Sequence, residues 1–250
     1  MPKKRPPKLK FPIAIAKAAE HAYKADQCKH LVPVVGKILA LYDDPTGHTD
    51  AIPTDILREV AKLRLATQDP ARIKQIERTA AKIARQFDRI NAQQVNRQLG
   101  SLGIKPALAA ATKARVQKFV QQNVSYITGL DKTMRDQVLD LVERAYVHGT
   151  AKDTLKKQLV ERIGVSESKA ALIARDQGNK FFGDMTRARH EAAGVLHYEW
   201  STSQDERVRD EHQILDGKVF AYSDPPDEGN PGEAVLCRCT AIPVISDAED

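Results

Sequence analysis

The residue types best suited to chemistry gather in the last fifty positions. Cys237 and Cys239 stand two positions apart, and His212 precedes them in the same segment. Side chains two positions apart on a strand point to the same side, so both thiols can face one metal ion. Zinc takes Cys and His ligands, usually four in a tetrahedron. The pattern is therefore compatible with a metal site, for zinc or another metal, that includes these three residues.

The fourth ligand of such a site is open on the sequence alone. Asp205, Asp216, Glu211 or water could complete it, and we include Asp205 in the predicted set. Two other states of the cysteines are open. Buried reduced thiols packed against the lobe are the state we favour on the sequence alone, whereas a strained C-x-C disulfide is disfavoured in a reducing compartment. His212 could instead hydrogen-bond a backbone carbonyl or pair with Asp205.

The same segment also has the residues for a structural polar network, which we favour over a reaction site. Asp205 is expected to cap a short helix by accepting its free N–H groups. Two arginines can each fork onto a carboxylate and tie this segment to a preceding long helix. A glycine is expected in a turn with positive φ, and the lone tryptophan in a small core. The predicted network comprises Arg175, Trp200, Arg209, Asp216 and Gly217.

Charge is distributed unevenly along the chain. The formal net charge is +6, but the last fifty residues hold 4 basic and 12 acidic side chains. A basic body with an acidic end suits a protein that touches nucleic acid or an acidic partner with one part only. The alternative is that the charges simply solvate long helices. The basic residues of a proline-rich N-terminal arm are the predicted DNA-phosphate contacts: Lys3, Lys4, Arg5, Lys8 and Lys10.

Apolar side chains at helical spacing predict helices up to Gly194. Pro33, which lacks an N–H, is expected to split the first helical segment. Thr54 and Asp69 are expected to cap the next two helices. The other predicted features are a helix end near residues 100–103, a start at Pro106, a break at 123–129, a cap at Asp131, and helices over 150–163 and 166–194.

The residue pattern changes after Gly194. Alternating side chains predict strands over 195–200 and 240–245, the second at a sheet edge or strand end because of Pro243. The expected fold is mainly α: an elongated helical bundle or arm, then a helical domain with a small C-terminal α+β lobe. The expected divisions are 1–12 (basic extended arm), 13–105 (helical region) and 106–250, with the lobe at 195–245. No apolar run reaches the roughly 20 residues that span a bilayer, so we expect a soluble protein.

Six motifs follow one another in the C-terminal half. They are Asn123 with Ile127-Thr-Gly-Leu130; Val147-His-Gly-Thr150 with Leu155; Ala171-Leu-Ile-Ala-Arg-Asp-Gln177; Ala193-Gly-Val195 with Tyr198-Glu-Trp200; Asp205-Glu-Arg-Val-Arg209 with His212 and Leu215-Asp-Gly217; and Pro231-Gly232 with Cys237-Arg-Cys239. In this order, residues 122–244 resemble the Mu F-like minor head proteins of tailed phages, the phage head morphogenesis family. Many members carry Thr-Glu where this chain has Asp176-Gln177, and residues 1–105 lie outside the resemblance.

The resemblance implies a structural protein and not an enzyme. Such proteins lie inside the capsid in few copies, associate with the portal, and aid capsid assembly and DNA packaging or ejection. We expect portal, scaffold and capsid proteins as partners, and packaged DNA through salt-sensitive phosphate contacts. The expected location is the virion, with the host cytoplasm during assembly. The alternatives are a metal-dependent hydrolase or nuclease in the C-terminal lobe, and a DNA-binding assembly chaperone using residues 1–105.

Overall fold

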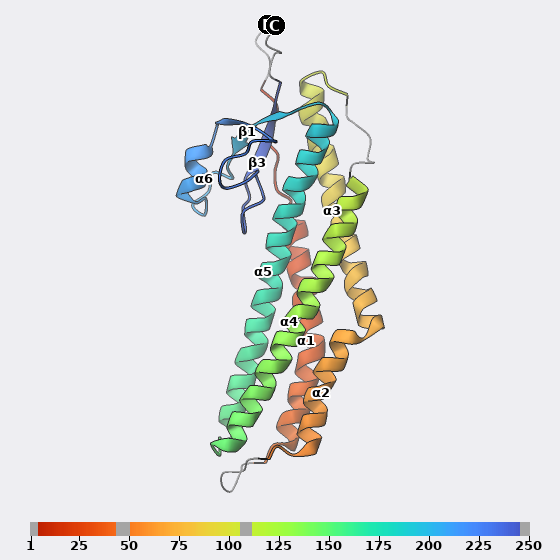
Figure 1. The fold of residues 1–250 in the computed structure, drawn as a ribbon, viewed down its shortest axis with the longest axis vertical. Helices are drawn as coiled ribbons and strands as arrows, with labels where there is room; N and C mark the ends of the chain where they lie inside the picture. Colours follow the sequence, from red (N-terminus) through yellow and green to blue (C-terminus); the bar gives the residue numbers. More distant parts are fainter. Residues whose placement is uncertain (1–4, 44–50, 106–111, 246–250) are drawn as a thin grey trace. The chain divides into compact units, whose positions relative to one another are not determined.

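The computed structural model describes residues 5–43, 51–105 and 112–245, which are mainly helical with a small C-terminal three-stranded antiparallel sheet (Figure 1). This confirms the fold class predicted from the sequence. The elements are α1 (Ile13–Leu41), α2 (Thr54–Gln68), α3 (Pro70–Ser101), α4 (Lys113–Val147), α5 (Lys152–Ala192), β1 (His197–Ser201), α6 (Asp210–Leu215), β2 (Val219–Ala221) and β3 (Thr240–Val244).

The chain divides into two compact units, each assembled from separate stretches of sequence. We call the first the helical unit; it comprises Ala18–Ala80 and Gln121–Ala174. The second, the sheet unit, comprises Met1–Lys17, Ala81–Val120 and Arg175–Asp250. Each unit combines residues that lie before and after position 105, and the division falls within α1, α3, α4 and α5.

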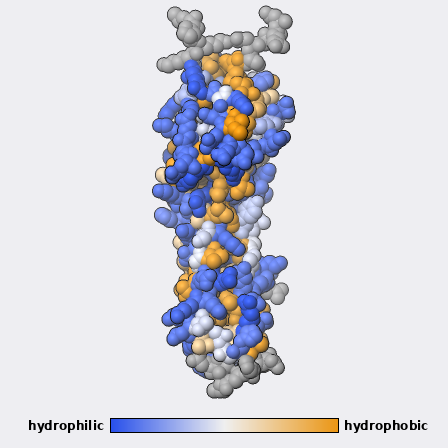
Figure 2. Space-filling model, turned by 90° about the vertical axis from the view of Figure 1, so that its left-hand side faces the viewer, coloured by the Kyte–Doolittle hydropathy of each residue, from blue (hydrophilic) through white to orange (hydrophobic). Residues whose placement is uncertain are grey.

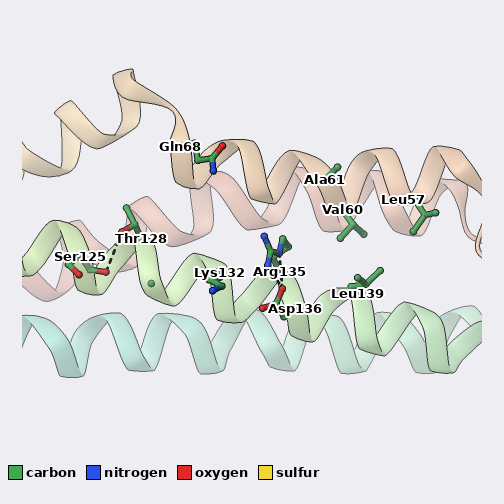
Figure 3. A pocket seen from close by; sticks show the side chains of 11 residues that line it. Leu57, Val60, Ala61, Gln68, Ser125, Thr128, Lys132, Arg135, Asp136 and Leu139 are labelled. Carbon is green, nitrogen blue, oxygen red and sulfur yellow. Dashed lines mark hydrogen bonds and ion pairs between the residues drawn. The ribbon is translucent and has the colours of Figure 1, made fainter.

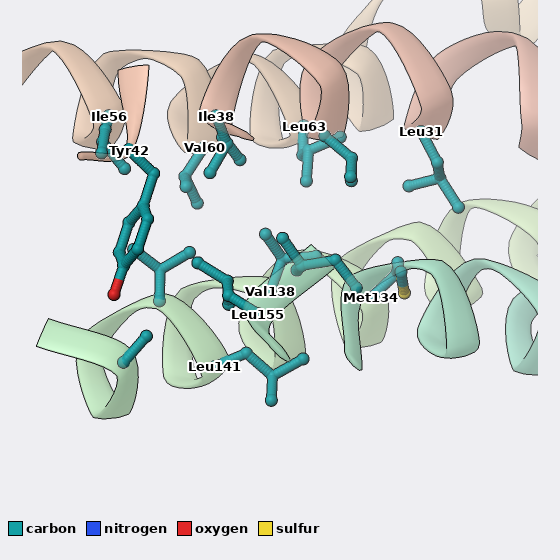
Figure 4. Close-up of a cluster of buried hydrophobic side chains, with 14 of the residues drawn as sticks. Leu31, Ile38, Tyr42, Ile56, Val60, Leu63, Met134, Val138, Leu141 and Leu155 are labelled. Atoms are coloured by element: carbon teal, nitrogen blue, oxygen red, sulfur yellow. The ribbon is translucent and has the colours of Figure 1, made fainter. Parts of the chain in front are cut away.

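A cluster of buried apolar side chains holds the helical unit together (Figure 4). Tyr42 and Tyr146 meet in it with ring centroids 4.9 Å apart, and the Tyr42 hydroxyl donates to the Thr150 carbonyl at 2.6 Å. Burying one large apolar side chain stabilises a fold by about 1.5–3 kcal/mol, so aliphatic residues suffice here. The buried members are Leu31, Val35, Ile38, Tyr42, Ile56, Val60, Leu63, Met134, Val138, Leu141, Val142, Ala145, Tyr146, Leu155, Leu159 and Ile163.

A buried ionic group lies in the same unit. The Arg72 guanidinium bridges two carboxylates, contacting Asp131 through Nη1 and Asp26 through Nη2, the latter at 2.6 Å. The Gln27 amide donates to Asp131 at 3.0 Å, and the Ser166 hydroxyl donates to Gln27 at 2.8 Å. Buried charges are tolerated when they are paired and hydrogen-bonded in this way.

The predicted split of the first helix at Pro33 is wrong, because α1 continues through this proline. An internal proline costs about 3 kcal/mol or more through the missing N–H and the ring clash. Pro33 lies on the exposed side of α1, while Leu31 and Val35 on either side of it are buried in the apolar cluster. Packing of these flanking side chains offsets the cost.

The predicted break at 123–129 and the cap at Asp131 are also wrong, since α4 runs unbroken from Lys113 to Val147. Polar side chains weaken a helix when they compete for its backbone groups. Here they have other partners: Asn123 accepts a hydrogen bond from the Tyr23 hydroxyl at 2.9 Å, and Asp131 is held by Arg72. Because Asn123 and Asp131 are bound by residues of other segments, they do not compete for the backbone hydrogen bonds of α4.

Three further boundaries test the capping predictions. The predicted separation into helices over 150–163 and 166–194 is wrong, because α5 runs without a break through Gly164. The expected cap at Thr54 is also wrong, since Thr54 is the first residue of α2 and Pro53 precedes it without a side-chain cap. Asp69 is confirmed as the α3 cap, since its carboxylate accepts the Ala71 N–H at 2.9 Å. The predicted start at Pro106 lies outside the described residues.

The small sheet has the order β2-β1-β3, with both pairings antiparallel. The two predicted strands are confirmed as β1 and β3, while β2 was not expected. Tyr198 and Trp200 of β1 are fully buried. Pro243 lies opposite Tyr198 of β1, on the edge strand β3. An edge strand tolerates proline, because no strand on its open side needs the missing N–H.

The described part of the N-terminal arm, residues 5–12, is irregular and packs within the sheet unit. Leu9 is buried, and the Phe11 ring lies 5.6 Å from that of Phe87. The Lys10 N–H donates to Gln94 at 2.6 Å, and Gln94 donates back to the Lys10 carbonyl at 2.8 Å. Its backbone and apolar side chains thus hold this part of the arm against the rest of the sheet unit.

Hydrophilic side chains cover most of the face drawn in Figure 2, with apolar ones interspersed among them. Among the described residues, no helix is both long enough and apolar enough to cross a membrane.

Candidate metal centre

Three predicted ligands meet in the sheet unit. His212 lies on α6, whereas Cys237 and Cys239 lie in the irregular segment just before β3 rather than in a strand. The Nδ1 atom of His212 is 3.6 Å from the Cys237 sulfur and 3.4 Å from the Cys239 sulfur. One ligand atom from each residue fits within a span of 4.8 Å, so the group could hold a metal ion.

The spacing of these atoms fits tetrahedral coordination. Zinc bonds of about 2.3 Å to sulfur and about 2.0–2.1 Å to nitrogen, at a tetrahedral angle, place S and N about 3.6 Å apart. The two observed separations between His212 and the sulfurs are 3.6 and 3.4 Å. Binding therefore needs little change in the separation of His212 from either sulfur.

The group is buried, which changes the acidity of its thiols. Cys237 and Cys239 are each 5% exposed and His212 is 3% exposed. A hydrogen bond from the Cys239 thiol, helped by backbone N–H groups, lowers the pKa of Cys237 to about 6 although burial opposes this. The same hydrogen bond, together with burial, raises the pKa of Cys239. The hydrogen bond between the two thiols thus favours loss of the proton from Cys237 first, and the thiolate is the form that binds metals.

Two neighbours fix the orientation of the imidazole. The Nε2 atom of His212 lies 3.2 Å from a carboxylate oxygen of Glu228. The Trp200 ring packs edge-on against His212 with centroids 5.3 Å apart. Trp200 belongs to the small core of the lobe, which comprises Tyr198, Trp200, Tyr222, Cys237, Cys239 and Ala241.

Asp205 is not brought to the other predicted ligands. Its carboxylate accepts from the Arg238 guanidinium at 2.6 Å and from the Arg207 N–H at 3.1 Å. The ion pair with Arg238 lowers the pKa of Asp205, although burial works against the shift. The expectation that Asp205 caps the short helix is wrong, because Arg209 precedes α6 without a side-chain cap and Asp205 closes the turn before it.

Asp216 and Gly217, both predicted network residues, stabilise the turn after α6. Burial raises the pKa of Asp216, but the N–H and hydroxyl of Thr202, at 2.7 and 3.0 Å, outweigh it and lower the value overall. Gly217 has φ +80°, which confirms the predicted positive-φ turn. The turn joins the end of α6 to β2 and so helps to place His212.

Arg209, one of the two predicted arginines, donates to the Val235 carbonyl at 2.6 Å, and Arg175 is exposed on α5. Asp176 makes a contact between α5 and the cysteine segment, because its carboxylate accepts the Leu236 N–H at 2.9 Å. The same residue accepts from Lys180 at 2.8 Å.

Close backbone approach makes a second contact between α5 and this segment. A Cβ atom added at Gly183 would lie 2.3 Å from the Pro231 carbonyl oxygen, so no larger residue fits without a shift. Gly232 on the opposite side has φ +94° and also approaches Gly183. The Pro231-Gly232 motif of the sequence therefore serves as a docking point on α5.

Sequence reasoning missed Glu228 and His190. Glu228 lies in an irregular stretch after two prolines, and no spacing rule linked it to His212. His190 is fully buried in α5, between the Tyr222 hydroxyl at 2.7 Å and the Gln98 side chain at 3.2 Å. A histidine near a helix end gives no signal of such partners, because they come from other segments.

The predicted nucleic-acid residues have mixed surroundings. Arg5 forms an ion pair with Glu199 of β1, whereas Lys8 and Lys10 are exposed. Lys3 and Lys4 lie outside the described residues.

A groove of about 830 Å³ lies in the helical unit between α2 and α4 (Figure 3). Leu57, Val60 and Leu139 form its apolar end, and Arg135 in it pairs with its neighbour Asp136. Its described lining residues include no cysteine or histidine, whereas the group that could hold a metal ion lies in the sheet unit.

Residues 136–242, which include all three ligands and Glu228, match the family model described as Phage Mu protein F like protein. Over 125 residues the chain is 42% identical to an uncharacterised protein of Haemophilus influenzae, covering 48% of this chain and 28% of that protein. Over 109 residues it is 33% identical to an uncharacterised protein of Methanocaldococcus jannaschii, covering 43% and 17%. The matched stretch thus spans less than a third of either relative. No solved structure gives a significant match. Residues 136–242 of this chain are therefore a Phage Mu protein F-like domain.

Proposed function

We propose that this chain is a minor head protein of a tailed phage or prophage. It acts inside the capsid in few copies, is associated with the portal, and aids head assembly and DNA packaging or ejection. The observation that carries this proposal is the match of residues 136–242 to the Phage Mu protein F family. During assembly the protein is in the host cytoplasm, and afterwards in the virion.

The role we propose is structural and not enzymatic. A catalytic zinc ion needs water and substrate to reach its open coordination position, so a catalytic site must be accessible to solvent. The three candidate ligands here are 3–5% exposed and packed against Trp200, which favours a structural ion. Failure of the purified protein to hydrolyse DNA or peptide with added zinc or magnesium is the expected result. Turnover that disappears in His212→Ala would instead support the metal-dependent hydrolase.

Zinc is the ion that we propose for the centre. Two thiols and one imidazole are ligands that zinc prefers, and the S–N separations fit its bond lengths. The test is elemental analysis of the protein purified without added metal, followed by zinc titration of the metal-stripped chain. One tightly bound zinc per chain is expected, and none after Cys237→Ser. A wild-type chain that takes up no zinc contradicts the assignment.

Packaged DNA is a proposed partner through phosphate contacts alone. Lys8 and Lys10 are exposed on the N-terminal arm, while Arg5 is already paired with Glu199. Binding through few lysines predicts weak affinity that falls with salt, with a modest slope set by the small number of phosphate contacts. A DNA complex that is insensitive to salt would remove this part of the proposal.

Quantitative mass spectrometry of purified, nuclease-treated heads tests the main proposal. This chain would be compared with the portal and major capsid proteins in heads from the source phage or induced prophage. We expect a few copies per head, near or below the number of portal subunits. Absence from both procapsids and finished heads would show that the protein has another role.

A further inference from the structure

His212 contacts different groups through its two ring nitrogens. Nδ1 faces the sulfurs of Cys237 and Cys239 at 3.6 and 3.4 Å. Nε2 lies 3.2 Å from a carboxylate oxygen of Glu228. An ionised carboxylate can only accept a hydrogen bond, and a neutral imidazole carries one N–H. The proton therefore belongs on Nε2, which leaves the lone pair of Nδ1 directed at the two sulfurs.

We propose that Glu228 is the positioning residue of the metal centre: it holds the Nε2 proton of His212 and so presents Nδ1 to the ion. This inference rests on the proposed zinc binding and adds a residue that the ligand motif does not contain. A carboxylate that accepts the second N–H of a metal-bound histidine fixes its tautomer and makes the other nitrogen a stronger ligand.

Two acids that the sequence also offered, Asp205 and Asp216, are engaged elsewhere. Asp205 is paired with Arg238, and Asp216 accepts two hydrogen bonds from Thr202. Within the part of the chain that the structure describes, Glu228 is the acid that contacts His212.

The backbone around Glu228 holds it in place. It follows Pro225-Pro226, and the Gly229 N–H donates to the Pro226 carbonyl at 2.8 Å to close a turn. Gly229 has φ +76°, a conformation that suits glycine at the end of such a turn. The Glu228 side chain is 37% exposed, so its carboxylate lies partly in water.

The His212 ring is also restrained on its face. Trp200 packs against it at an interplanar angle of 74°, and His212 is itself almost completely buried. A flip that exchanged the two nitrogens would place Nε2 toward the thiols and break the contact with Glu228. Carboxylate and indole together therefore favour one ring orientation before the ion arrives.

Zinc affinity of the full chain tests the inference. The metal-stripped protein is titrated with zinc in competition with a chromogenic chelator, comparing wild type, Glu228→Ala, Glu228→Gln and Asp227→Asn. We expect Glu228→Ala to weaken binding by about 10–100-fold while the stoichiometry stays at one. Glu228→Gln keeps an acceptor without its charge and should weaken binding less. Asp227 is the exposed acid next to Glu228, so Asp227→Asn removes the same charge and should leave affinity unchanged.

The tautomer of His212 gives a second measurement. It would not change if Glu228 only packed against the lobe. Long-range ¹H–¹⁵N spectra of the metal-stripped wild-type chain should show the proton on Nε2, and Glu228→Ala should give a mixture of tautomers. Wild-type affinity and an unchanged tautomer in Glu228→Ala would overturn the inference while leaving zinc binding intact. A wild-type chain that binds no zinc overturns both proposals. If zinc affinity falls in Cys237→Ser or His212→Ala but not in Glu228→Ala, the role of Glu228 is overturned and zinc binding stands.

Discussion

Gln98 of α3 and His190 of α5 face each other in the interior of the sheet unit, with Gln98 Oε1 3.2 Å from His190 Nε2. The other ring nitrogen accepts from the Tyr222 hydroxyl at 2.7 Å. The Gln98 amide group donates to the carbonyls of Pro7 and Ala241 at 2.9 and 3.2 Å. One buried pair thus links the N-terminal arm, two helices and the edge strand β3.

The His190 pair makes stability depend on pH. Burial lowers the pKa of His190 to about 3, whereas an unfolded histidine has a pKa of about 6.5. Between these values only the unfolded chain binds the proton, so stability falls as pH drops below about 6.5. The expected contribution is a loss of about 2 kcal/mol at pH 5 relative to pH 8. Urea unfolding at both pH values should show this loss reduced in His190→Gln. The exposed His148, changed to Gln, should keep the wild-type difference.

The contact between Gly183 and Pro231 predicts that replacing glycine by alanine in α5 lowers the stability at position 183 but raises it at position 164. In Gly183→Ala the new methyl group meets the Pro231 carbonyl at 2.3 Å, so the loop must shift. We expect a loss of about 1–3 kcal/mol in the free energy of unfolding. Gly164→Ala meets no atom within 4 Å and should stabilise the helix by about 0.5–1 kcal/mol. Equal effects at the two positions would show that the close approach is not rigid.

The Arg72 group of the helical unit predicts a strong effect of removing one charge. Arg72→Met leaves Asp26 and Asp131 without their shared partner, and should cost about 3–5 kcal/mol in unfolding measurements. Adding Asp131→Asn to that variant should recover part of the loss, because one buried charge is removed. Arg58→Met breaks an exposed pair with Asp55 and should cost no more than about 1 kcal/mol. A small effect of Arg72→Met would mean that water reaches the carboxylates.

Removing the metal should lower the melting temperature, and this effect should depend on the ligands of the C-terminal lobe and not on the cysteine of the helical unit. An ion bound only by the folded state stabilises it by about 2.7 kcal/mol at one hundred times its dissociation constant. A chelator should therefore lower the melting temperature of the wild-type chain and leave that of Cys237→Ser unchanged. Cys28→Ser changes a cysteine of the helical unit and should respond like wild type. A response to chelator that survives Cys237→Ser would place the ion elsewhere.

Local chemistry determined much of the fold in advance. Helical periodicity, the Asp69 cap and the alternating residues of β1 are short-range features, so the mainly α class, α3 and two strands follow from neighbouring residues. Gly217 belongs to the same group, since a positive φ is a property of one residue and its turn. The C-x-C pair with His212 likewise identified the three residues whose chemistry suits a metal.

Tertiary structure decided whatever depended on partners distant in sequence. Pro33, Asn123 and Gly164 look like helix breakers, yet buried neighbours and hydrogen bonds from other segments keep α1, α4 and α5 continuous. In the candidate metal centre, Asp205 and Glu228 are both carboxylates, and residue type alone does not distinguish them. In the folded chain Asp205 pairs with Arg238 and Glu228 contacts His212, because the position of a side chain in space depends on the packing of the whole unit.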